Sequence, residues 1–86
     1  MKTKKLVRKM KALLSADRRA QVAKADSLKE ILEKLDKKDL ALREKLDRAE
    51  DEEQRHQILR KLEVIAAQRK KGAELSAELE AAREAE

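Results

Sequence analysis

Large apolar residues recur at helical spacing along the middle of the chain. The steps between them alternate between four and three residues, which places them on one stripe of an α-helix. The first stripe consists of Leu28, Leu32, Leu35, Leu42, Leu46 and Ala49. A second stripe, formed by Ile58, Leu62, Ile65, Leu75 and Leu79, has helical spacing but does not continue the phase of the first. The two stripes therefore predict two helices rather than one.

An acidic segment without a large apolar residue separates the two stripes. It reads Glu50-Asp51-Glu52-Glu53-Gln54. Acidic residues are favourable at a helix N-terminus because of the helix dipole, and Asp51 is a suitable N-cap residue. We predict a tight turn near residues 49–52. The alternative is a single uninterrupted helix with a phase slip.

Three further positions bear on the ends and the continuity of these helices. Ser27 and Glu30 have the spacing of a capping box, which predicts that the first helix begins there. Asp39 occupies an apolar position of the first stripe, so it is rim-exposed, sets the register, or marks a helix break at residues 36–39. Gly72 is the only glycine, and the stripe continues beyond it, so we expect an unbroken helix. Folding the chain at residue 50 places Gly72 opposite Leu28.

The predicted fold class is all-α, an antiparallel helical hairpin of coiled-coil type with a basic N-terminal helix. The residues expected in its core or in an oligomer interface are Leu28, Leu32, Leu35, Leu42, Leu46, Ile58, Leu62, Ile65, Leu75 and Leu79. Four more apolar residues, Ile31, Leu40, Leu59 and Val64, lie off the seam. Two helices alone would leave them exposed, so we expect a homodimer that forms a helical bundle.

Charge divides the chain into three segments. Residues 1–26 form a basic N-terminal helical arm, residues 27–72 the hairpin, and residues 73–86 an acidic helical extension. Residues 1–24 hold nine Lys or Arg and one acid, a balance of +8, whereas residues 73–86 hold five Glu and one Arg, a balance of −4. We expect the arms to pack together, with a kink at residues 15–17. Residues 1–13 then extend beyond any partner.

Composition limits the possible classes of protein. The chain has no Cys, Pro or aromatic residue and 48% charged residues, which is typical of long helices. No apolar run approaches the roughly 20 residues that span a bilayer. We expect a cytoplasmic protein; a mitochondrial presequence is the weaker alternative, because the basic, acid-free N-terminus is rich in Lys rather than Arg and Ser.

No residue pattern predicts catalysis, a cofactor or a metal site. Glu53 and His56 have the Glu-x-x-His spacing of carboxylate-bridged metal bundles, but they lie beside the predicted turn in a polar stretch. A solvated surface histidine is the simpler interpretation. Ser15, Ser27 and Ser76 lie far from His56 in a hairpin, so a Ser-His-Asp site is not expected. The sequence predicts no enzyme.

The basic N-terminal segment is the candidate binding surface. Its cations are Lys2, Lys4, Lys5, Arg8, Lys9 and Lys11, and Leu6, Met10 and Leu13 form a narrow apolar stripe on the same helix. We predict a self-associating interaction or scaffold protein that presents this helix to a macromolecular partner. The alternative is a small DNA- or RNA-binding protein that contacts phosphates. An anionic membrane surface and a solvated tail are the remaining possibilities.

Overall fold

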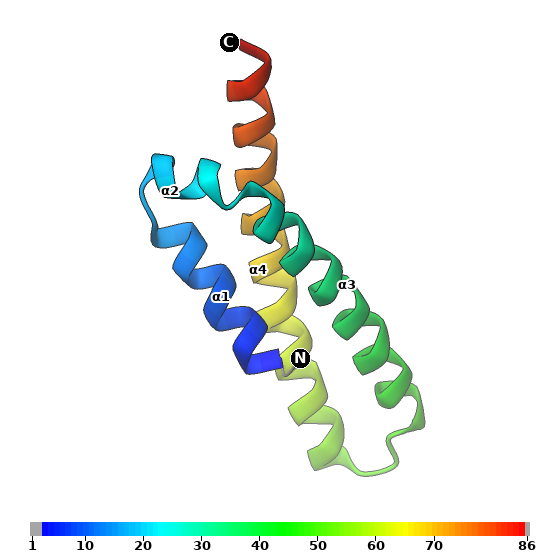
Figure 1. The fold of residues 1–86 in the computed structure, drawn as a ribbon. Coiled ribbons are helices and arrows are strands. Elements are labelled where there is room, and N and C mark those ends of the chain that lie inside the picture. The colour runs from blue at the N-terminus through cyan, green and yellow to red at the C-terminus, as the bar shows by residue number, and fades with distance from the viewer. Residues whose placement is uncertain (1–2, 86) are drawn as a thin grey trace.

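The computed structural model describes residues 3–85, which form four α-helices and no strand. In chain order these are α1 (Thr3–Ser15), α2 (Arg18–Ala23), α3 (Ala25–Arg48) and α4 (Glu52–Ala85). Figure 1 shows α3 and α4 side by side as an antiparallel hairpin, α1 against that hairpin, and α2 as a short link from α1 to α3. The predicted all-α hairpin is confirmed.

The turn of the hairpin lies where the acidic segment predicted it. Residues 49–51 separate α3 from α4. The Glu53 amide donates a hydrogen bond of 3.1 Å to Asp51 Oδ1, so Asp51 caps α4 as expected. Helix α4 then continues through Gly72 without interruption, and α3 continues through residues 36–39. The alternatives of a single straight helix and of a break at Asp39 are both wrong.

The N-terminal helix does not extend away from the hairpin, as the sequence had led us to expect for residues 1–13. It folds back and packs against both α3 and α4 (Figure 1). The physical reason is its apolar stripe: Leu6, Met10 and Leu13 are 1%, 0% and 5% exposed. Covering the hairpin removes these side chains from water, which an extended arm would not do.

Side-chain caps stabilise the chain reversal between α1 and α3. The predicted kink at residues 15–17 is here a sharp change of direction. Gln21 is buried and donates through Nε2 to the Leu13 carbonyl at 2.9 Å, which satisfies a carbonyl at the end of α1. Asp17 Oδ1 accepts from the Ala20 amide at 2.9 Å and caps α2.

Helix α3 begins at Ala25, so the capping box predicted at Ser27 and Glu30 is wrong. Only Lys24 separates α2 from α3, and the Leu28 amide donates to the Lys24 carbonyl at 3.0 Å. The preceding helix therefore leads directly into α3, which needs no side-chain cap at Ser27.

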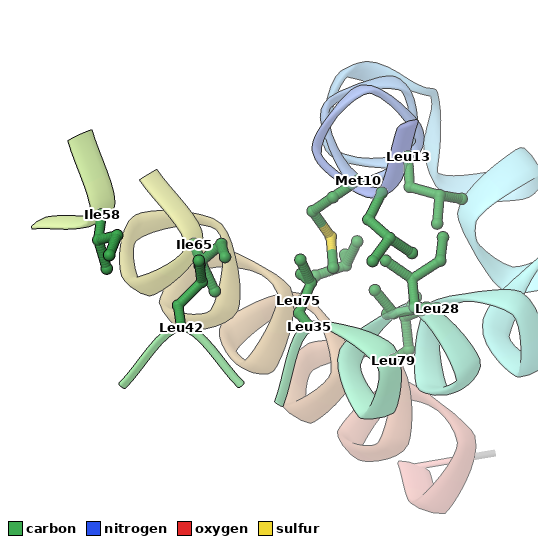
Figure 2. Packing of buried hydrophobic residues seen from close by; sticks show 11 residues of the cluster. Met10, Leu13, Leu28, Leu35, Leu42, Ile58, Ile65, Leu75 and Leu79 are labelled. Carbon is green, nitrogen blue, oxygen red and sulfur yellow. The ribbon is translucent and has the colours of Figure 1, made fainter. Parts of the chain in front are cut away.

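Three helices build one apolar core. Figure 2 shows Met10 and Leu13 of α1 beside Leu28 of α3. The buried apolar residues of the hairpin are Leu28, Ile31, Leu35, Leu42, Ile58, Ile65, Leu75 and Leu79. Leu32, Leu46 and Leu62 are partly buried and pack against this core. All ten predicted core positions thus contribute, but the sequence analysis did not assign the three residues of α1 to the core.

Gly72 lies where α1 meets the hairpin. A Cβ atom at this position would lie 2.6 Å from Met10 Cε and 2.8 Å from Leu32 Cδ2, closer than packed carbon atoms approach. The missing side chain therefore makes room for Met10 and Leu32. The nearest atoms belong to Met10, which the two-helix pairing rule left out, and to Leu32, one helical turn from the predicted partner Leu28.

Asp39 is buried within a small group of charged residues. Its side chain is 9% exposed, and Oδ2 accepts from Arg43 Nε at 2.8 Å on the same helix. Arg69 of α4 lies 3.6 Å from the same oxygen through Nη1, and its Nε lies 2.7 Å from Asp36 Oδ1. Asp39 is therefore not rim-exposed, and the charge pairs join α3 to α4 at one register.

Removing Arg69 is expected to destabilise the hairpin. Arg69→Met leaves the Asp39 carboxylate buried with Arg43 as its one remaining charged neighbour, and we expect a loss of about 1–3 kcal/mol in the free energy of unfolding. Urea denaturation measures it. Lys70→Met, on the neighbouring exposed position, should cost less than about 0.5 kcal/mol. Equal losses for both variants would show that the charge group adds nothing to stability.

The four off-seam apolar residues have different environments. Ile31 is 7% exposed, because α1 of the same chain covers it. Leu40, Leu59 and Val64 stay 63%, 42% and 45% exposed. Homodimerisation remains a prediction, and light scattering of the protein in solution tests it.

Candidate functional site

A groove with positively charged walls lies between α1 and α4. It has a volume of about 490 Å³. Helix α1 contributes Lys4, Arg8 and Lys11 along one wall, and helix α4 contributes Arg60 and Lys61 along the other. Thr3, Val7 and Val64 complete its lining. We call this surface the basic groove.

Folding explains why these cations share one surface. The spacing of Lys4, Arg8 and Lys11 places them on one face of α1. The apolar stripe of α1 is buried against the hairpin, so the cationic face points along α4 and outward. Val64, which is off the α3–α4 seam, then faces Val7 across the groove instead of lying alone on the surface.

The charge of the groove is not neutralised by the rest of the chain. No acidic residue lines it. Within residues 3–85, none of its five cations takes part in an ion pair. All five are exposed. A cleft lined by one sign of charge concentrates the field and attracts ligands of the opposite sign.

A second groove, between α1 and α3, has a different electrostatic character. Its volume is about 330 Å³, and Lys9, Lys24 and Lys34 line it together with Glu30. Lys34 Nζ lies 2.9 Å from Glu30 Oε1. The hydrogen bond from Lys34, assisted by its charge, lowers the pKa of the Glu30 carboxyl below its usual value. This internal acid makes the second groove a weaker site for an anion.

The structure distributes the six predicted basic residues over several surfaces. Lys4, Arg8 and Lys11 line the basic groove and Lys9 lines the second groove. Lys5 is exposed and lines neither, and Lys2 lies outside the described residues. Arg60 and Lys61 were not predicted from the sequence. The sequence feature that could have indicated them was Val64, an apolar residue off the seam that lies four residues after Arg60 and three after Lys61. Without the position of α1, however, Val64 did not identify the helix against which it packs.

The acidic extension forms ion pairs with α2 and with α3. Arg18 Nη2 lies 3.1 Å from Glu78 Oε2, and Lys29 Nζ lies 3.9 Å from Glu80 Oε1. The predicted contact between the oppositely charged arms is confirmed by the Arg18–Glu78 ion pair, and within residues 3–85 α1 forms no ion pair with the acidic extension. As a result, α1 lies away from these two charge pairs, and its cations face the basic groove.

His56 lies on the surface near the start of α4. Its Nε2 atom is 3.9 Å from Glu52 Oε2, and both side chains are largely exposed. In residues 3–85, no group of three or more potential ligand residues is placed to hold a metal ion. The same part of the chain contains no helix whose length and hydropathy suit a membrane span.

Comparisons of the chain with protein-family models, curated proteins and solved structures found no match.

Proposed function

We propose that this chain is a non-enzymatic helical interaction protein that binds nucleic acid through the cationic face of α1. The observation that supports this proposal is the unpaired, acid-free row of Lys4, Arg8 and Lys11 on a helix held rigidly against the hairpin. Phosphate groups are the polyanionic ligand that such a row neutralises, with release of counterions.

The packing of α1 favours nucleic acid over a membrane surface. A basic amphipathic helix adsorbs to lipid by burying its apolar face between headgroups. In this chain Leu6, Met10 and Leu13 are already buried in the core. Membrane adsorption would require α1 to leave the hairpin, whereas phosphate binding uses the helix where it lies.

The folded-back α1 also weakens the argument for a purely self-associating scaffold. Self-association was expected because of apolar residues which two helices cannot cover. Helix α1 now packs over the core that contains Ile31, and Val64 belongs to the basic groove. Leu40 of α3 and Leu59 of α4 remain as exposed residues of this set. Cation-mediated binding is therefore the better-supported function.

The test is a salt-dependent titration of the full-length protein with DNA and RNA duplexes. If Lys4, Arg8 and Lys11 each neutralise one phosphate, these three contacts alone weaken binding by roughly 40-fold when salt rises from about 50 to 200 mM. Replacing Lys4, Arg8 and Lys11 by Gln should remove this roughly 40-fold part of the salt dependence, whatever other contacts the protein makes. Fluorescence anisotropy of a labelled duplex measures the salt dependence of both proteins.

A matched control separates the cationic face from net charge. Lys37, Lys45 and Lys70 are exposed, lie outside both grooves and form no ion pair within residues 3–85. Replacing these three by Gln removes the same charge and should keep the unmodified salt dependence. Equal loss in both triple variants contradicts the proposal. So does absence of duplex binding at low salt, or preferential binding to anionic vesicles or to an acidic polypeptide.

A further inference from the structure

We infer that the basic groove between α1 and α4 is a composite site for one sugar–phosphate strand of a nucleic-acid duplex. This inference rests on the proposed function and adds to it the second wall, formed by Arg60 and Lys61, and the form of the ligand. The site does not exist in either helix alone, because its two walls are about 50 residues apart in sequence.

The dimensions of the groove fit a single backbone strand. Lys4 and Lys11 are seven positions apart, which corresponds to about 10 Å along the helix at 1.5 Å per residue. Because a strand winds around the duplex axis, its consecutive phosphates are farther apart than the rise of about 3.4 Å per nucleotide, so two or three phosphates lie within reach of this wall. The axes of packed helices lie roughly 8–10 Å apart, so the groove along their common surface is narrower than a duplex, whose major groove alone is about 12 Å wide. A backbone strand can lie between the side chains, whereas a whole duplex cannot.

Both walls provide cations at the same level of the groove. Arg60 and Lys61 precede Val64 on α4, and Lys4 and Arg8 flank Val7 on α1. A strand lying over the two valines would thus have cations on either side. Arg8 and Arg60 offer bidentate contacts to phosphate oxygens, which Lys does not.

The lining of the groove favours a duplex over a free single strand. Proteins that hold single strands stack the bases on aromatic side chains, each stacked base contributing about 1–3 kcal/mol. This chain has no aromatic residue. Two valines offer apolar contact to sugars but no stacking surface. A duplex keeps its bases stacked internally and has the higher charge density, so it is the form that this site binds.

The α4 wall gives a test that is independent of α1. Arg60→Gln/Lys61→Gln should lower the loss of duplex affinity between about 50 and 200 mM salt by a factor of about 12, because two contacts are removed. Lys70→Gln/Arg83→Gln removes the same charge from exposed positions of α4 outside the groove and should leave the ratio unchanged. Circular dichroism and urea denaturation verify that both variants stay folded.

The outcomes separate this inference from the proposed function. If the unmodified protein binds no duplex, the proposed function fails. If it binds, and the α1 triple variant loses salt dependence while Arg60→Gln/Lys61→Gln behaves like its control, the composite groove is wrong and α1 alone forms the site. Affinity for a single strand of equal length that matches or exceeds affinity for the duplex overturns the choice of ligand.

Discussion

Leu35→Ala is expected to lower the free energy of unfolding by about 2–5 kcal/mol, the usual range for a fully buried leucine. Leu35 is 0% exposed and belongs to the apolar core that α1, α3 and α4 form together. The truncation of Leu35 to Ala removes apolar contacts from this core and leaves a cavity. For a small domain this is a large share of the total stability, so the midpoint of urea denaturation should fall strongly.

Leu40 provides the matched control on the same helix. It is 63% exposed, so Leu40→Ala should change the free energy of unfolding by no more than about 0.5 kcal/mol. A homodimer that buries Leu40 would make this variant costly as well, and the cost would then depend on protein concentration. Similar losses for the two variants at every concentration would contradict the three-helix core described above.

The second large effect concerns the contact between Met10 and Gly72. Met10→Ala should cost about 2–5 kcal/mol, because Met10 is 0% exposed and its loss leaves a cavity beneath α1. Gly72→Leu should cost about 1–3 kcal/mol by overpacking, since even a Cβ atom would lie 2.6 Å from Met10 Cε. The double variant should cost less than the sum, with a coupling of about 0.5–3 kcal/mol, because the new leucine occupies space that Met10 vacated.

Helix docking has a local readout besides global stability. Amide hydrogen exchange in α1 should accelerate in Gly72→Leu more than exchange near the turn at residues 49–51, where α1 makes no contribution to packing. Ala73→Leu is the control, because Ala73 is exposed on the same helix. Additive energies in the double variant, or unchanged exchange in α1, would mean that Met10 and Gly72 do not position this helix.

The hairpin was predictable because its determinants are local. Alternating steps of three and four residues identify Leu28, Leu35 and Leu42 as one helix face wherever that helix lies. The change of phase before Ile58 and the capping ability of Asp51 then indicate a turn. Each of these signals lies within a few residues of the feature that it predicts, so no long-range contact had to be known.

The position of α1 could not be derived in the same way. Leu6, Met10 and Leu13 have the spacing of any amphipathic helix, whether it packs within the chain, in a dimer or on a membrane. The pairing of α3 with α4 appeared complete when only two helices were considered, and Gly72 had a plausible two-helix partner in Leu28. Only the three-helix packing identifies Met10 as the residue that uses the space at Gly72.

The same distinction applies to the candidate site. Net charge and the concentration of Lys and Arg near the N-terminus follow from composition, and three of the predicted cations do line the basic groove. Arg60 and Lys61 join them because burial of the α1 stripe brings two distant segments together. Helical periodicity determines which side chains share a face of one helix. Which faces meet depends on shape and on the total apolar area buried, and these are properties of the folded chain as a whole.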